Sequence, residues 1–435
     1  MLLPRPALGR EAASAEVSCA GSVPPRPACT SAVAARPLHV PWRARRQSSG
    51  DGVKSSDSAT LLFATIAAGG GHVASARAMA EAVERLYPGR FEVRISDFMH
   101  EVGATAFDRR HKAMWRWALR YPLSARLGQR AIDAAPQLAM RVQRRLLRSF
   151  ARRAAAHFRL DPVDLVVSNH GLVTTGLALA QRHHGLDVPV LTFATEPHGI
   201  SAYWADPWAD HILVPSEAIR RTLARMGVPA SRLEVVGYPV QQAFLEASGQ
   251  AEARRRLRLE DRFTCLVSLG GEGVAAKPKA LIEALRSPSP APQLVVICGR
   301  NAALKDELLA MELPGLRVEG YVDGMADYIA ASDVVVGKAG PASVYEALAV
   351  GRPVLVTGYA GLNERGVMRF LEQCSLGRFV RDATELRREV RRLQSDPDAL
   401  QVVRTRCLGL GLRAQTDAIA HRIVAYLYEH RREAA

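Results

Sequence analysis

Three consecutive glycines, Gly69, Gly70 and Gly71, followed at once by His72, constrain this chain more than any other feature. They lie between an apolar run over 61–66 and a helical pattern that begins near Val73. A buried strand, a bare glycine turn and a helix N-terminus together form a cradle for a polar or phosphorylated ligand. The histidine at its mouth can carry a proton near neutral pH. The tetrapeptide therefore predicts both an α/β fold and a ligand site at which a histidine can transfer a proton.

The size and charge of the chain limit its class. Its 435 residues predict two or three domains, and a 48% hydrophobic content lets each bury a core. The net charge of +15 favours an anionic partner: nucleic acid, a membrane surface or a phosphorylated substrate. The six cysteines show no metal-ligand spacing, so no metal site is expected. No apolar run reaches about 18 residues, so no membrane-spanning helix is expected.

Residues 1–57 differ in composition from the rest, being rich in Ala, Arg, Pro and Ser and poor in acids. They lack the continuous apolar core of a secretory signal. A plastid or mitochondrial transit peptide has this composition, and so does the translation of a start codon assigned too far upstream in a GC-rich bacterial genome. We favour the second origin, and both predict disorder.

From Thr60 onward, short β-rich runs alternate with helical stretches, which predicts parallel βαβ units. The turn Gly237-Tyr238-Pro239 separates two series of these units. We therefore expect two Rossmann-like halves, an acceptor-side and membrane-facing half over 58–238 and a donor-side half over 239–405, and then a helical segment over 406–435. Because open α/β sheets bind ligands at the carboxyl ends of their strands, two facing sheets would place the site in a central cleft.

The expected elements follow from the apolar periodicity. Strands are predicted at 60–67, 91–97, 164–168, 188–194, 210–214, 233–236, 264–269, 293–298, 316–321, 333–337 and 353–357. Helices are predicted at 73–86, 172–183, 216–226, 275–286, 301–311, 325–331, 341–349 and 363–373.

The segment 105–158 interrupts the first half with thirteen Arg or Lys residues and only two acids. Aromatic residues lie among these cations, so Trp115, Arg116, Trp117 and Arg120 are candidates for contact with a membrane or a lipid acceptor. One interpretation is an amphipathic surface that lies on an anionic membrane. The other is a set of solvated helices whose aromatic rings pack on the domain. The composition resembles that of a lipid interface, and we weigh the two interpretations about equally.

Three loops of the second half follow predicted strands, at 268–273, 298–301 and 337–343. The third is the most specific, because Gly340 lets the backbone approach a ligand and Pro341 suits the first turn of a helix. The free amides that follow, including that of Ser343, would face an anion, and Glu346 could accept from ribose hydroxyls. No G-x-x-x-x-G-K-[ST] motif is present, which disfavours a P-loop NTPase.

The first half places further polar residues at predicted strand ends. His170 follows one strand, and Glu196 follows the strand that ends near Phe193. Each alone is more often a turn or cap residue than a catalyst. With His72 they share one edge of a parallel sheet, which favours a common site.

Together these motifs resemble those of monogalactosyldiacylglycerol synthases and bacterial processive diacylglycerol glucosyltransferases, members of glycosyltransferase family 28 with the GT-B fold. The quoted motifs are Gly69–His72 with Ala74-Ser75-Ala76, then 270–273, 298–301 and 338–341. The resemblance covers roughly residues 60–400 in the same order. It implies inverting transfer from a UDP-sugar, as donor substrate with no further cofactor, to a lipid hydroxyl at the membrane surface. A cytoplasmic enzyme, peripheral on the inner face of the cell membrane, is then expected.

The resemblance also implies roles for residues. His72 and Glu196 would serve the acceptor hydroxyl, although the family usually has Asp at the second position, and Gln241 stands where the family has a donor-phosphate arginine. Asn363 and Glu364 would contact the sugar hydroxyls. The full implied UDP-sugar set is Gly71, Gly271, Glu272, Gly273, Arg300, Asn301, Tyr321, Lys338, Ala339, Gly340, Pro341, Ser343, Glu346, Asn363 and Glu364.

Three other functions remain open at this point. One is a peptidoglycan-type transferase that uses UDP-N-acetylglucosamine and a polyprenyl-linked acceptor. Another is an isomerase of the UDP-N-acetylglucosamine 2-epimerase type, which needs no membrane segment. A sugar-nucleotide sensor without turnover is the third. Nucleic-acid binding is not expected, because the cations concentrate beside tryptophans and no recognition motif is present.

Overall fold

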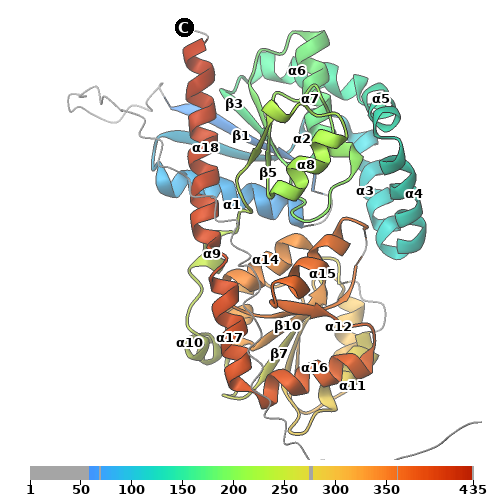
Figure 1. Ribbon diagram of the computed structural model, residues 1–435, viewed down its shortest axis with the longest axis vertical. Coiled ribbons are helices and arrows are strands. Elements are labelled where there is room, and N and C mark those ends of the chain that lie inside the picture. Colours follow the sequence, from blue (N-terminus) through green and yellow to red (C-terminus); the bar gives the residue numbers. More distant parts are fainter. Residues whose placement is uncertain (1–57, 68–69, 274–277, 360, 434–435) are drawn as a thin grey trace, which may run out of the picture. The chain divides into compact units, whose positions relative to one another are not determined.

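The computed structural model describes residues 58–67, 70–273, 278–359 and 361–433 (Figure 1). The predicted N-terminal extension over 1–57, Gly69, residues 275–277 of a predicted helix and the last two residues of the predicted C-terminal helical segment lie outside this part of the chain.

Within the described residues, twelve parallel strands form two sheets of six, which confirms the predicted α/β class. The first sheet has the order β2-β1-β3-β4-β5-β6 and the second β12-β11-β10-β7-β8-β9. The strands of the first sheet are β1 (Ala59–Thr65), β2 (Phe91–Asp97), β3 (Leu165–Ser168), β4 (Val190–Phe193), β5 (His211–Val214) and β6 (Leu233–Val235). Those of the second are β7 (Thr264–Ser268), β8 (Gln293–Ile297), β9 (Leu316–Glu319), β10 (Val334–Lys338), β11 (Val354–Gly358) and β12 (Gly377–Phe379).

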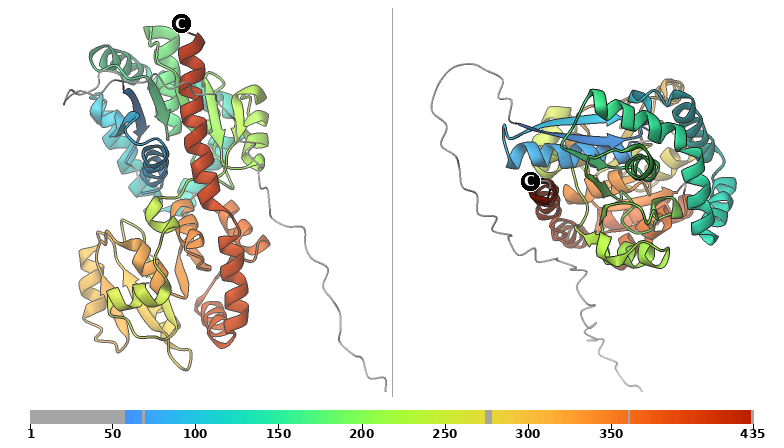
Figure 2. Two further views of the ribbon diagram at one scale, coloured as in Figure 1. Left: turned by 90° about the vertical axis from the view of Figure 1, so that its left-hand side faces the viewer. Right: turned by 90° about the horizontal axis from the view of Figure 1, so that it is seen from above.

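Helices connect these strands and cover the sheets (Figures 1 and 2). Those of the first half are α1 (Gly71–Leu86), α2 (Phe98–Glu101), α3 (Thr105–Arg120), α4 (Pro122–Ala134), α5 (Pro136–Leu146), α6 (Arg148–Leu160), α7 (Gly171–His184) and α8 (Glu217–Arg225), with the 3-10 turns η1 (Ala202–Trp204) and η2 (Ala230–Arg232). The second half adds α9 (Gln242–Leu245), α10 (Gln250–Leu257), α11 (Pro278–Arg286), α12 (Ala302–Leu309), α13 (Met325–Ala331), α14 (Pro341–Ala349), α15 (Glu364–Gln373), α16 (Ala383–Ser395), α17 (Pro397–Leu408) and α18 (Leu412–Glu433).

The burial of alternate residues explains why the strands form where they do. In β1, Leu61 and Phe63 enter one core cluster, whereas Leu62 and Ala64 enter another on the opposite face of the sheet. Successive side chains of a strand point to opposite faces, so a strand covered on both sides must be apolar throughout. Such uninterrupted apolar runs are the pattern from which the sequence predicts the strands.

Each sheet contains one switch point, where the chain leaves two neighbouring strands in opposite directions. In the first sheet it lies between β1 and β3, and in the second between β7 and β10. Ligands of doubly wound sheets bind outside the carboxyl ends of the strands at this point. The glycine loop and His170 follow β1 and β3, and the loops at 268–273 and 337–343 follow β7 and β10.

The C-terminal helix α18 packs against α1 of the first half. Arg85 of α1 forms an ion pair with Asp417 of α18, and the Tyr87 hydroxyl lies 2.7 Å from Nδ1 of His421. The last helix thus holds the C-terminal end of the chain against the first half.

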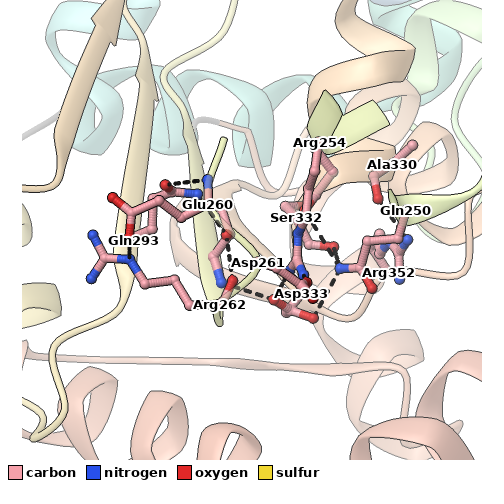
Figure 3. A network of polar contacts seen from close by, with 12 residues as sticks. Gln250, Arg254, Glu260, Asp261, Arg262, Gln293, Ala330, Ser332, Asp333 and Arg352 are labelled. Atoms are coloured by element: carbon pink, nitrogen blue, oxygen red, sulfur yellow. Dashed lines mark hydrogen bonds and ion pairs between the residues drawn. The ribbon is translucent and has the colours of Figure 1, made fainter. Parts of the chain in front are cut away.

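A buried polar network fixes the opposite, amino end of the second sheet (Figure 3). Asp333, which is only 6% exposed, precedes β10. One carboxylate oxygen, Oδ2, accepts from Arg254 and from the Thr264 amide, both at 2.8 Å, and Oδ1 accepts from Arg404 at 2.6 Å. A single acid therefore joins the start of β10 to α10, β7 and α17.

Candidate active site

His72 stands in the first turn of α1, at the switch point of the first sheet. Its Nδ1 lies 2.9 Å from the backbone oxygen of Asn169 and 2.9 Å from Oγ1 of Thr195. Because a carbonyl oxygen can only accept, Nδ1 carries the proton in the neutral ring, and Nε2 keeps a lone pair. Burial lowers the pKa of His72 to about 4, so the ring is neutral at physiological pH.

Two further histidines extend this group of rings, one beside His72 and one beside the second. His170, at the N-cap of α7, lies 4.6 Å from His72 between ring centroids, and His111 of α3 lies 5.2 Å from His170. Burial lowers the pKa of both His170 and His111, which favours the neutral form of each ring. The predicted proximity of His72 and His170 is therefore present, and the insertion supplies a third ring.

Glu196 follows β4 but its carboxylate is directed toward η1. It is 6% exposed, accepts from the Tyr203 hydroxyl at 2.8 Å and accepts from the Ser201 amide at 3.2 Å. Burial raises the pKa of Glu196 to about 7, against these hydrogen bonds, which favour the carboxylate. Among the described residues it is Thr195, one position earlier, that contacts His72.

In the second half, the loops after β7 and β8 are joined into one unit. The Arg300 amide donates to the Gly271 carbonyl at 2.9 Å, and the Asn301 side-chain amide donates to the Gly273 carbonyl at 3.0 Å. The Asn301 Oδ1 also accepts from the Leu304 amide, so Asn301 caps α12. These backbone contacts need glycine, because a Cβ on Gly299 would lie 2.4 Å from the Gly270 oxygen, and Gly299 has a φ of 57°.

We expect Gly299→Ala to separate these two loops and to weaken UDP binding by roughly tenfold or more, since the added carbon meets backbone and the residue has positive φ. Isothermal titration with UDP measures this. Gly249→Ala, before α10 and outside the predicted site, is the matched control, because a Cβ there meets nothing within 4 Å and φ is −60°. UDP affinity unchanged in Gly299→Ala would show that the joined loops do not hold the donor.

Cations and aromatic rings lie around these loops. The ammonium of Lys338 lies 3.5 Å from the position of a Cβ on Gly270. Burial lowers the pKa of Lys338, and the nearby acids Glu364 and Glu272 oppose that shift. Arg300 lies 3.7 Å from the Glu272 carboxylate and 5.0 Å from the Tyr321 ring centroid. Lys338 and Arg300 thus place positive charge beside the glycine loops at the second switch point.

The helix α14 begins at Pro341 directly after Gly340, as predicted. Ala339 is buried and Ser343 is exposed in the first turn, where backbone amides lack intrahelical partners. One turn further, burial raises the pKa of the half-buried Glu346 to about 7. The helix start is therefore able to receive an anion, with a carboxyl group nearby.

Side chains connect the two switch points. Oγ of Ser75, in α1, donates to the Tyr238 hydroxyl at 3.4 Å, and the Tyr238 ring lies 4.3 Å from that of Tyr345 in α14. The Tyr345 hydroxyl lies 2.9 Å from Nε2 of His198, two residues after Glu196. The N-terminal halves of α1 and α14 are therefore linked by one continuous chain of side chains.

The predicted sugar-contacting pair lies at the same junction. A Cβ on Gly199 would lie 2.6 Å from the Asn363 oxygen, so the loop after β4 passes directly over Asn363. Glu364 begins α15, and its charge acts on Lys338. The side chain of Gln241 donates to Glu81 of α1 at 3.3 Å.

The four candidate membrane residues divide between inside and outside. Trp115 is partly buried against the core of the first half, whereas Trp117 is 47% exposed and Arg116 and Arg120 are exposed. Trp115 thus packs on the domain, as the second interpretation predicts, whereas the membrane contact of Trp117 stays a prediction.

The sequence did not single out Asn169, Thr195 and Tyr203 as site residues, although they orient His72 and Glu196. Thr195 directly precedes Glu196, and this position next to a predicted site residue was a signal that could have identified it. Asn169 acts through its backbone oxygen, which residue type does not reveal.

Comparison with known proteins agrees with the motifs. Residues 273–365 match the glycosyltransferase family 28 C-terminal domain. Monogalactosyldiacylglycerol synthase 1 of Arabidopsis thaliana is 24% identical over 357 residues, which are 77% of this chain and 65% of that protein. The chain thus spans slightly less than two thirds of this relative. The predicted resemblance is confirmed.

Solved structures share the fold. The crystal structure of Anabaena Alr3699/HepE in complex with UDP is 16% identical and has a TM-score of 0.53, covering 85% of this chain and 100% of that one. The glycosyltransferase of Rickettsia africae is 12% identical with a TM-score of 0.54, covering 85% of this chain and 99% of that one. They confirm the predicted GT-B fold.

Proposed function

We propose that this chain is an inverting glycosyltransferase that moves a hexose from a UDP-sugar to diacylglycerol, or to a related glycolipid, at a membrane surface. The observation that carries the reaction is the neutral His72, with its free Nε2 lone pair, in the helix α1 that Ser75, Tyr238 and Tyr345 link to α14. The likeness to monogalactosyldiacylglycerol synthase over 77% of the chain supports the acceptor, and the UDP bound to Alr3699/HepE supports the donor.

In this account His72 acts as the general base. A glycerol or sugar hydroxyl is a poor nucleophile at neutral pH, so a group within hydrogen-bond reach must take its proton as it attacks the anomeric carbon. The Nε2 lone pair takes the proton, while Nδ1–H stays on the Asn169 oxygen and orients the ring. Glu196 positions η1 through Tyr203.

The donor binds at the second switch point. The departing UDP develops negative charge on its phosphates, and the free amides at the start of α14, with Lys338 and Arg300, stabilise that charge. Glu346 accepts from the ribose hydroxyls, and Asn363 and Glu364 hold the sugar. These amides and cations of the chain itself stabilise the negative charge of the departing UDP.

An exposed apolar surface supports the proposal that the protein acts at a membrane surface. In the part of the chain that the structure describes, nine of the fifteen exposed large hydrophobic side chains lie on or between α3, α4 and α5, namely Met114, Trp117, Tyr121, Leu123, Leu127, Ile132, Leu138, Val142 and Leu146. Exposed apolar residues interleaved with arginines are typical of helices that lie in an anionic lipid interface. Within the described residues, no helix is both long and apolar enough to span a bilayer.

The pH dependence of turnover distinguishes the two candidate bases. The pKa of His72 is lowered to about 4 and that of Glu196 is raised to about 7. A base must be deprotonated, so a His72 base predicts a constant kcat as the pH falls from about 8 to about 5. A Glu196 base predicts a tenfold loss per unit below about pH 7, and that loss would disappear in Glu196→Gln. The measurement uses saturating donor, so that titration of Glu346, which would change donor binding, does not alter the observed kcat.

The donor panel tests the function itself. Incubation with UDP-glucose, UDP-galactose or UDP-glucuronate and diacylglycerol vesicles should yield glycolipid with one of them. Turnover of UDP-N-acetylglucosamine without any acceptor would instead identify an isomerase, and its transfer to a polyprenyl-linked acceptor would identify a peptidoglycan-type enzyme.

A further inference from the structure

The helix α4, in the segment 105–158 of the first half, contacts loops of both halves through one of its faces. Its polar residues Arg126, Gln129 and Asp133 recur with a spacing of three and four residues, which places them on one side of the helix. All three are partly buried, whereas Leu123 and Leu127 are exposed. The polar face is therefore the one that packs against the rest of the protein.

Two residues of this face reach the segment that joins β11 to α15 in the second half. Nη2 of Arg126 donates to the Tyr359 backbone oxygen at 2.5 Å, and its guanidinium lies 3.7 Å from the Tyr359 ring centroid. Oε1 of Gln129 accepts from the Leu362 backbone amide at 2.8 Å. Because a backbone N–H can only donate, this contact requires an acceptor oxygen on the side chain of Gln129.

The segment held in this way leads directly into the proposed sugar-binding pair. Leu362 is followed by Asn363 and Glu364, and the turn around them is tight. A Cβ on Gly361 would lie 2.2 Å from Oδ1 of Asn363, and the Glu364 amide donates to the Gly361 oxygen at 3.3 Å. A displacement of Leu362 therefore displaces Asn363 and Glu364 as well.

The third residue of the polar face fixes α4 to the first half. Oδ1 of Asp133 accepts from Oγ of Ser201 and from the Ala202 amide, both at 2.8 Å. Ala202 begins η1, in the loop that follows β4. Arg126 and Gln129 thus extend from a helix that a different part of the site already holds in place.

We infer that Arg126 and Gln129 are positioning residues for the donor sugar. They hold the segment 359–362, and with it Asn363 and Glu364, in the place from which these two side chains bind the sugar hydroxyls. The inference rests on the proposed function and identifies the part of the chain that selects the hexose. UDP-glucose and UDP-galactose differ only in the orientation of one hydroxyl group, so discrimination depends on the exact positions of the groups that bind it.

Isothermal titration with UDP, UDP-glucose and UDP-galactose tests this without any lipid acceptor. Gln129→Leu removes the acceptor oxygen and keeps a side chain of similar size. The affinity for the hexose donor that the wild type binds more tightly should fall roughly tenfold, so that the two hexose donors bind more equally, while UDP affinity stays unchanged. Gln129→Glu keeps an acceptor oxygen and should retain the wild-type preference.

The matched control is Gln137→Leu, because Gln137 of α5 is exposed and forms no hydrogen bond with another described residue. Unchanged hexose-donor affinity in Gln129→Leu would overturn the inference. An equal loss of UDP affinity would also overturn it, since α4 would then support the whole donor site rather than the sugar. Equal wild-type affinities for the two hexose donors would contradict the selection of a hexose. The proposed transfer fails separately, by the absence of a lipid product.

Discussion

His72→Asn is expected to lower kcat by about 10²- to 10⁴-fold, the range that a general base contributes, with UDP affinity unchanged. The asparagine amide can replace Nδ1–H as the donor to the Asn169 oxygen, but it provides nothing in place of Nε2. The substitution therefore removes the base and keeps the local hydrogen bond. Single-turnover kinetics with saturating UDP-sugar measure the chemical step directly.

The control is His100→Asn, an exposed histidine of α2, which should leave kcat unchanged. If His72→Asn retains more than about a tenth of the wild-type kcat, His72 is not the base. If instead UDP binding is lost together with turnover, His72 holds the donor and the account of the first switch point is wrong.

Asp333→Ala is expected to destabilise the protein by about 3–5 kcal/mol. Removal of this buried carboxylate leaves Arg254 and Arg404 without their shared partner, and a third arginine, Arg352, lies nearby. Burial and the neighbouring Arg404 already lower the pKa of Arg352 to about 10, and Asp333 opposes that shift. Urea unfolding followed by circular dichroism measures the loss.

Asp261 offers a matched comparison within the same network. It also pairs with Arg254, at 2.5 Å, but its side chain is 96% exposed. Asp261→Ala should therefore cost no more than about 1 kcal/mol, the usual range for a surface ion pair. Similar losses for the two variants would mean that burial does not determine the strength of this network.

The strands could be predicted because each buried strand is a short apolar run, and the structure places them within a few residues of the expected bounds. The strand β12 was missed. It has only three residues, Gly377–Phe379, with an exposed arginine in the middle, so no apolar run marks it. The predicted helix over 406–435 is interrupted, because α17 ends at Leu408 and α18 begins at Leu412.

The positions of the site residues could be predicted from strand ends, but their partners could not. His72 and His170 lie together because β1 and β3 are neighbours in the sheet. The direction of the Glu196 carboxylate depends on Tyr203 and Ser201 in an irregular loop, where no periodicity constrains the backbone. The anchor of His72 is a backbone oxygen, which every residue type carries.

The central claim is transfer of a hexose from a UDP-sugar to a lipid hydroxyl. Mass spectrometry of the lipids extracted after incubation with diacylglycerol vesicles and each UDP-sugar tests it most directly. We expect a hexosyl-diacylglycerol product with the wild-type protein and a strongly reduced amount with His72→Asn. If the protein binds UDP but yields no glycosylated lipid with UDP-glucose, UDP-galactose or UDP-glucuronate, the claim is contradicted.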